Sequence, residues 1–163
     1  MRARNVLAFA VSFVLAAAVL AQGSGEAKAK SAPKAGAKAA VIMPAGDLKW
    51  ADLDPNVPGV KIADLWGNHA TGAYGGFTKF PAGFSAPLHT HTHDMKIVVI
   101  SGTFIHGPEG KPEVRLGPGS YLMQPANYRH TTQCDKASEC LIFGESSGKF
   151  DIHPVDEGKA PAK

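Results

Sequence analysis

The sequence predicts a single all-β domain built from short strands. No long segment shows hydrophobic residues repeating every 3.6 positions, so long amphipathic helices are not expected. Instead, short runs rich in β-branched and aromatic residues alternate with turns that contain Gly, Pro and Asp. Residues 97–100 (Ile-Val-Val-Ile) are apolar on both faces, which is typical of a strand inside a sandwich or barrel. Many short strands at this spacing favour a closed or double-sheet fold.

Eight strands are predicted from these runs. In chain order they are Val60–Trp66, Ala73–Phe80, Met95–Ser101, Thr103–His106, Glu113–Leu116, Ser120–Gln124, Arg129–Gln133 and Glu139–Gly144. Residues 47–54 are expected to add a short helical turn or cap. The large apolar side chains expected to fill the core are Phe77, Phe80, Phe104, Leu122, Ile142 and Phe143. No internal repeat is present, so the strands form one unit.

The first 40 residues are predicted to lie outside this domain. Arg2 and Arg4 precede an apolar, Ala-rich run that is short for a membrane span, and small residues come just before Gln22. This pattern indicates a secretory signal peptide over residues 1–21, with an uncleaved membrane anchor as the alternative. Residues 22–40 lack any hydrophobic periodicity and are expected to form a flexible Ala/Lys-rich linker. We therefore expect a periplasmic or secreted protein with no stable membrane span after cleavage.

The remaining chain is predicted to divide into a domain over residues 41–153 and a polar, disordered tail over residues 154–163. The whole chain has a formal net charge of +3, but its cations are concentrated near the start. From Val41 onward, 11 Lys and Arg face 13 Asp and Glu. Without a basic stripe on the domain, a nucleic-acid partner is not expected. The sequence also lacks a Gly-rich phosphate loop and a nucleophilic triad spacing, which disfavours phosphoryl transfer and peptidase chemistry.

Three alternating histidines are the most informative feature of the domain. His89, His91 and His93 are separated by Thr, a residue that favours extended backbone. Side chains at alternate positions of a strand point to one face, so these imidazoles can approach a single point. His130 follows a turn-rich run and comes from a separate strand. Imidazoles that converge from two strands suit a transition metal such as Zn, Cu, Fe or Ni, and we predict a metal site here.

These residues resemble the two motifs of the cupin superfamily. The first motif, G-x5-H-x-H-x3,4-E-x6-G, is matched by Gly83, His89, His91 and Gly102. The second motif, G-x5-P-x-G-x2-H-x3-N, is matched by Gly119, Pro125 and His130. Asn127 occupies the second glycine position and Cys134 the final Asn position; Asn is the non-glycine residue that best tolerates positive φ. The resemblance extends to single-domain cupins and implies a jelly-roll β-barrel, also called a double-stranded β-helix.

One departure from the motif affects the expected metal ligands. Met95 stands where cupins usually place a glutamate ligand, and a thioether is a poor ligand for a hard divalent ion. The resemblance implies three histidine ligands, namely His89, His91 and His130. They could act without a carboxylate, or His93 or Asp94 could complete the set or support it by hydrogen bonding. Met95 could pack in the barrel or serve as an axial copper ligand. The cofactor is expected to be one divalent ion of Fe, Zn, Mn, Ni or Cu.

Two cysteines and the remaining histidines lie near these motifs. Cys134 and Cys140 flank a polar, turn-like segment, so an exported protein could join them in a disulfide across a hairpin. Alternatively they are free thiols, and Cys134 then shares a strand face with His130. We expect surface or loop positions for the other polar residues considered, which are His69, His106, His153, Tyr128 and Arg129.

The resemblance implies an exported metal-binding cupin that acts as a divalent-metal-dependent enzyme. Dioxygenase-like, isomerase and hydrolase reactions on a small organic molecule inside the barrel are all compatible with three histidine ligands. The alternative is a non-enzymatic sensor or carrier that binds a metal or small ligand. Because many chemistries share this fold, the motif predicts the fold better than the reaction. Exposed sheet edges could also pair two copies into a homodimer.

Overall fold

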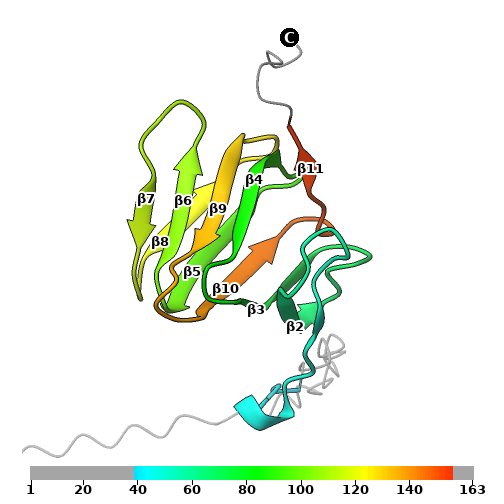
Figure 1. Cartoon of the computed structure of the whole chain (residues 1–163). Coiled ribbons are helices and arrows are strands. Elements are labelled where there is room, and N and C mark those ends of the chain that lie inside the picture. Colours follow the sequence, from blue (N-terminus) through cyan, green and yellow to red (C-terminus); the bar gives the residue numbers. More distant parts are fainter. Residues whose placement is uncertain (1–38, 156–163) are drawn as a thin grey trace, which may run out of the picture. The chain divides into compact units, whose positions relative to one another are not determined.

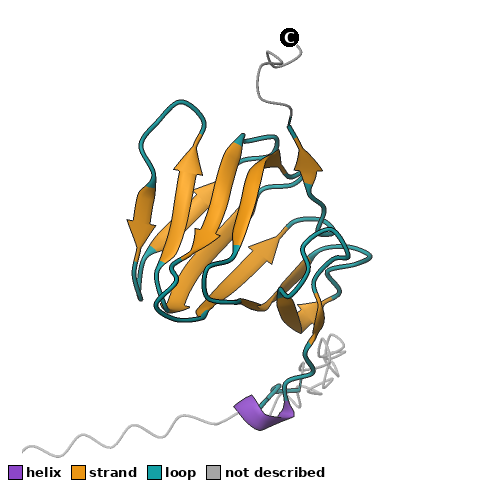
Figure 2. Ribbon diagram, viewed as in Figure 1, coloured by secondary structure: helices purple, strands orange, loops and turns teal. Residues whose placement is uncertain are grey.

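The computed structural model describes residues 39–155. The predicted signal peptide, residues 22–38 of the predicted linker and residues 156–163 lie outside this described part. Within it, secondary structure consists of strands and one short 3-10 helix, and this all-β character is visible in Figure 2. No helix in residues 39–155 has the length and apolar character needed to cross a membrane.

Two antiparallel sheets form a β-sandwich (Figure 1). The six-stranded sheet has the order β1-β2-β3-β10-β5-β8 and the five-stranded sheet the order β11-β4-β9-β6-β7. The bounds are Ala45–Asp47 for the 3-10 helix η1, and Ala51–Asp52 (β1), Lys61–Gly67 (β2), Tyr74–Phe80 (β3), Ser85–Thr90 (β4), Met95–Ser101 (β5), Phe104–Pro108 (β6), Val114–Leu116 (β7), Tyr121–Gln124 (β8), His130–Cys134 (β9), Cys140–Ser146 (β10) and His153–Pro154 (β11). The predicted all-β, double-sheet fold is confirmed.

All eight predicted strands are present, with ends within two residues of their predicted positions. The helical turn lies slightly earlier than expected, over Ala45–Asp47. The five-stranded sheet also continues past the expected domain end at residue 153. Pro154 pairs with His89 of β4, and the amide of Val155 donates to the carbonyl of Leu88 at 2.9 Å. This C-terminal segment therefore belongs to the sandwich because its backbone groups complete the edge of β4.

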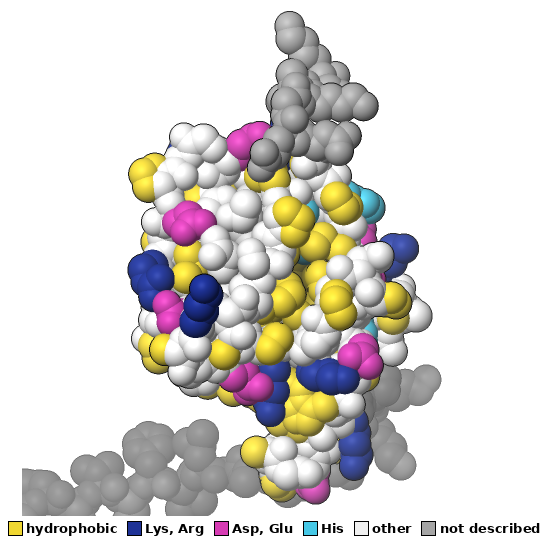
Figure 3. Space-filling view, in the orientation of Figure 1, with side chains coloured by type: hydrophobic (Ala, Val, Ile, Leu, Met, Phe, Trp, Pro, Cys, Tyr) yellow, Lys and Arg dark blue, Asp and Glu magenta, His cyan; other side chains and the backbone are white. Residues whose placement is uncertain are grey.

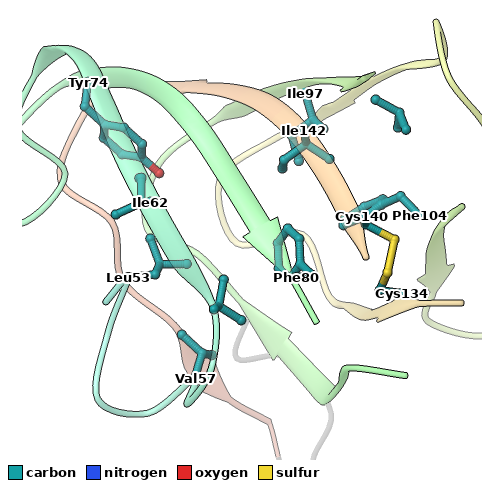
Figure 4. Packing of buried hydrophobic residues seen from close by; sticks show 12 residues of the cluster. Leu53, Val57, Ile62, Tyr74, Phe80, Ile97, Phe104, Cys134, Cys140 and Ile142 are labelled. Carbon is teal, nitrogen blue, oxygen red and sulfur yellow. A yellow bond between two sulfur atoms is a disulfide. The ribbon is translucent and has the colours of Figure 1, made fainter. Parts of the chain in front are cut away.

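The core lies between the two sheets and is built from the alternate residues that face inward (Figure 4). Phe80, Phe104 and Ile142 are buried there as predicted, and Leu122 packs against them. Cys134 on β9 and Cys140 on β10 form a buried disulfide with a Cα–Cα distance of 5.8 Å. Since β9 and β10 belong to different sheets, this disulfide joins the two layers rather than the two strands of one hairpin.

The predicted core positions of Phe77 and Phe143 are wrong. The two residues are register partners on β3 and β10, and their rings meet edge to face at 6.1 Å. Their neighbours Thr78 and Ile142 are buried, so the alternation of strand side chains puts both phenylalanines on the outer face of the six-stranded sheet. There they remain half-buried. Composition had suggested the core, but the strand phase decides the face.

Candidate metal centre

The three predicted ligands come together on two neighbouring strands of the five-stranded sheet. His89 on β4 is the direct register partner of His130 on β9. His91 is the residue immediately after the end of β4. One ring nitrogen from each of the three lies within 4.8 Å of the others. The ring centroids of His89 and His130 are 4.2 Å apart. The ring centroid of His91 lies 5.0 Å from that of His89 and 5.3 Å from that of His130. We call these three residues the histidine triad.

The loops that follow β4 and precede β9 are held together by two backbone-directed hydrogen bonds. The amide of Asn127 donates to the carbonyl of His91 at 2.8 Å, and the amide of Ala126 donates to Asp94 Oδ1 at 2.7 Å. Asn127 adopts a φ of 61°, a left-handed conformation that asparagine tolerates better than most residues. This turn therefore joins the two motif segments and sets where His130 begins its strand.

The triad histidines share one hydrogen-bonding pattern. His89 Nδ1 lies 2.6 Å from the carbonyl oxygen of Pro87, and His130 Nδ1 lies 2.8 Å from that of Tyr128. His91 Nδ1 contacts the carbonyl oxygen of Asp151. Carbonyl oxygens only accept hydrogen bonds, so each Nδ1 carries the proton and donates. Nε2 of each ring then has the free lone pair. Backbone acceptors impose this same tautomer on metal-binding histidines.

Burial keeps the triad neutral. Removal from solvent is the main cause that lowers the pKa of all three imidazoles, to about 4 for His91 and about 3 for His130. Mutual repulsion between the protonated rings adds to this effect, while the backbone hydrogen bonds oppose it. At neutral pH the three rings are therefore uncharged bases. Neutral, pre-oriented imidazoles with converging lone pairs fit a divalent transition metal.

The other candidate ligands occupy different places. His93 lies in the bend after β4 and packs against Gly148, because a Cβ added to that glycine would fall 2.2 Å from His93 Nε2. Asp94 is exposed and accepts the hydrogen bond from Ala126. Neither residue joins the triad among the described residues. Met95 does face the same interior space, with Sδ 3.7 Å from Nε2 of its strand partner Gln124.

His106 is not a surface or loop residue, contrary to our expectation. It lies on β6, is only 4 % exposed, and its ring centroid is 5.0 Å from that of His130. The Tyr128 ring stacks with His106 at 5.9 Å and with His130 at 6.1 Å. Neither ring nitrogen of His106 has a hydrogen-bond partner among the described residues. Of the residues expected at the surface, Tyr128 is half-buried, and Arg129 forms an ion pair with Glu109 at 2.8 Å.

The triad borders a small interior chamber of about 50 Å³. A larger vestibule of about 340 Å³ adjoins it, since five residues border both spaces: Val57, Phe84, Ala86, His89 and Ile152. Asn56, Pro58, Pro87 and Pro154 also line the vestibule. Figure 3 shows hydrophobic side chains gathered on the face where β4 and β11 lie. The two spaces thus share lining residues, His89 among them, and the lining of the vestibule is largely apolar.

Several residues around the site were missed from the sequence. Phe150 and Ile152 line the chamber although they belong to a segment with no predicted strand. Their i, i+2 apolar spacing was the available signal, since it matches the period of extended backbone. His106 could also have been found, because it follows Phe104 by two residues on a predicted strand and must share its inward face.

A sandwich of two antiparallel sheets with three histidines converging from the first and second motif segments defines a cupin. The chain belongs to the cupin-like family described as "Domain of unknown function (DUF4437)", which matches residues 65–163.

The chain is also similar to three other proteins. The dimethylsulfoniopropionate lyase DddQ of Ruegeria pomeroyi is 30 % identical over 76 residues, which is 46 % of this chain and 37 % of the lyase. The match thus spans little more than a third of the curated relative's length.

Two solved structures share the fold. The polyketide cyclase RemF of Streptomyces resistomycificus has a TM-score of 0.60 at 16 % identity, covering 76 % of this chain and 90 % of that one. An RmlC-like cupin of Ralstonia eutropha JMP134 has a TM-score of 0.55 at 19 % identity, covering 69 % and 78 %.

Proposed function

We propose that this protein binds one divalent transition metal through His89, His91 and His130 and acts as a metal-dependent enzyme on a small organic molecule. The observation that carries this proposal is the shared arrangement of the triad. Three buried, neutral rings donate Nδ1–H to backbone carbonyls, and one ring nitrogen from each lies within 4.8 Å of the others. The partial likeness to a lyase adds support for an enzyme.

The metal, when bound by the triad, would supply Lewis acidity to a ligand in the chamber. The protein would contribute position and exclusion of water. Phe80, Phe84 and Phe150 line the chamber, so part of a ligand held there contacts aromatic side chains instead of solvent. Gln124 and Thr132 offer an amide and a hydroxyl on the same lining, and both are buried. These groups can orient a polar head group beside the triad.

A non-enzymatic carrier or sensor is the second candidate. One observation favours it: among the described residues that line the chamber and vestibule, no Asp, Glu, Lys or Tyr is present to move a proton. Turnover would then depend on the metal and on groups of the substrate itself. Binding without chemistry needs no such residue.

Metal analysis of His89→Ala and His130→Ala tests the proposal. The wild-type protein should bind one equivalent of Zn²⁺ or Co²⁺, and each variant should bind it at least about a hundredfold more weakly. Loss of a single supporting partner already costs 10–100-fold, so loss of a ligand should cost more. Titration calorimetry and elemental analysis measure this.

His93→Ala is the matched control for these variants. It removes a histidine from the same segment, but His93 packs against Gly148 and lies outside the triad. Metal affinity should stay within about threefold of wild type. If His93→Ala lost metal as completely as His89→Ala, or if all variants kept one equivalent, the assignment of the three ligands would be wrong.

Turnover separates the two candidate functions. Protein loaded with Fe²⁺, Zn²⁺ or Mn²⁺ would be incubated with a panel of phenols, diketones and short carboxylic acids while O2 consumption and product masses are followed. An enzyme should convert at least one compound, and His130→Ala should abolish the conversion. Stoichiometric metal with binding but no product across the panel would favour the carrier.

A further inference from the structure

The chamber and vestibule carry no charged side chain, and this determines what the site can accommodate. The described residues that line the two spaces include apolar side chains, three neutral histidines, and the polar residues Asn56, Ser85, Gln124 and Thr132. None is Asp, Glu, Lys or Arg. Met95 lines the chamber together with the triad, and its thioether contributes no charge.

A divalent ion held by three neutral imidazoles would bring two uncompensated positive charges into this space. Burying an unpaired charge is costly, and an opposite charge in contact offsets the cost. Since no lining residue supplies that negative charge, a ligand that is anionic at the metal would offset it. Gln124 Nε2 can donate a hydrogen bond to such a ligand, because its one described partner is the weakly accepting Met95 Sδ at 3.7 Å.

The size of the two spaces limits the rest of the ligand. A chamber of about 50 Å³ holds only a few non-hydrogen atoms, whereas the vestibule of about 340 Å³ holds a longer body. Val57, Phe84, Ile152 and Pro154 line that vestibule, and no lining side chain there would compensate a second charge.

We infer that the site binds ligands that are anionic at the metal and apolar along the remainder, such as monocarboxylates or phenolates with a short hydrophobic chain. This inference rests on the proposed metal site and adds the class of ligand. The charge that a carboxylate side chain would contribute is provided by the ligand instead.

Three six-carbon probes test the inference on protein loaded with Co²⁺, whose visible absorption bands report ligands at the metal. Hexanoate has an anionic head and an apolar tail, hexanamide has a neutral head, and adipate carries a second charge at the far end. Hexanoate should shift the bands and bind at least tenfold more tightly than either of the other probes at pH 7.5.

Two variants of one residue separate charge from shape. Met95→Glu places a carboxylate in the chamber and should weaken hexanoate binding at least tenfold while keeping or raising Co²⁺ affinity. Met95→Gln has nearly the same shape without the charge, so hexanoate should bind it at least about tenfold more tightly than it binds Met95→Glu.

Each outcome is informative. Equal binding of hexanamide or adipate, no response to hexanoate, or equal weakening in Met95→Glu and Met95→Gln would overturn the inference while leaving the metal site intact. Failure of the wild-type protein to bind Co²⁺ would instead overturn the proposed function, and that result appears before any probe is added.

Discussion

The histidines of this protein have different environments, and the backbone around each one decides what it can do. His89 and His91 alternate on extended backbone and point inward, whereas His93 lies past a bend and packs against Gly148. His106 is as buried as the triad but has no hydrogen-bond partner for its ring nitrogens among the described residues. Residue type alone therefore does not identify a ligand. Its position relative to carbonyl acceptors and to other imidazoles does.

Protonation of the triad should make the metal-free protein less stable in mild acid. Burial lowers the pKa of His91 to about 4 and of His130 to about 3, whereas the unfolded chain keeps ordinary values near 6.5. Below about pH 6.5 the unfolded state therefore binds more protons than the folded state. Stability is highest above that pH and falls as the pH drops toward 4, by about 1.4 kcal/mol per pH unit for each of the two groups.

Chemical denaturation of the metal-free protein between pH 4.5 and 7.5 measures this slope. Carboxylates also titrate in acid, so the comparison is made with His130→Leu, which lacks one of the two histidines. Its slope should be smaller by about 1.4 kcal/mol per pH unit. Identical slopes for the two proteins would contradict a buried, neutral His130.

His106→Leu should leave the metal-free domain as stable as wild type or make it slightly more stable. A buried polar group without a partner costs about 1–3 kcal/mol, and an apolar side chain of similar size removes that cost. Thermal unfolding of both proteins without metal provides the measurement. A loss of more than about 2 kcal/mol would show that the His106 ring is needed for packing against Tyr128 and His130.

At the scale of elements, strand pairing positions the site and the disulfide holds the layers. β4 lies between β11 and β9, so His89 is supported by pairing on both sides, with Pro154 and with His130. The C-terminal segment contributes the carbonyl of Asp151 to His91 and the side chain of Phe150 to the chamber. The Cys134–Cys140 disulfide lies in the core cluster and is absent from the chamber lining. The disulfide and the proposed metal ligand are thus separated along β9, where Cys134 and His130 are four residues apart.

Removing the disulfide should reduce stability without affecting the metal. The double variant Cys134→Ala/Cys140→Ala loses a cross-link that closes a short loop, which the chain-entropy estimate values at about 2 kcal/mol. Urea midpoints of the variant and the oxidised wild type measure the loss. Metal stoichiometry serves as the control, and a decrease would contradict the separation of the disulfide from the triad.

At the scale of the whole molecule, export stays a prediction because the predicted signal peptide lies outside the described residues. We expect a bacterial host to cleave full-length protein after Ala21 and release a periplasmic product that begins at Gln22. Mass spectrometry of the periplasmic fraction would identify that terminus. Recovery of intact protein in the membrane fraction would instead favour an uncleaved anchor. Formation of a homodimer also stays a prediction.

The sequence by itself was enough for the fold class and for the three converging histidines. Period-two alternation predicts which neighbours share a face, and the motif spacing places His130 on a separate strand from His89 and His91. The positive φ at Asn127 followed from its place in the second motif. These features depend on local geometry, which short stretches of sequence specify.

The tertiary structure alone decided the features that depend on how distant segments meet. Phe77 and Phe143 are on the outer face, His106 approaches the triad, and the disulfide connects two sheets, because sheet phase and strand order are settled by packing over the whole domain. The uncharged lining of the chamber and vestibule also depends on how distant segments meet, since the lining residues are scattered along the sequence between Leu53 and Pro154. Which side chains enclose one space is a property of three-dimensional proximity, and no local pattern encodes it.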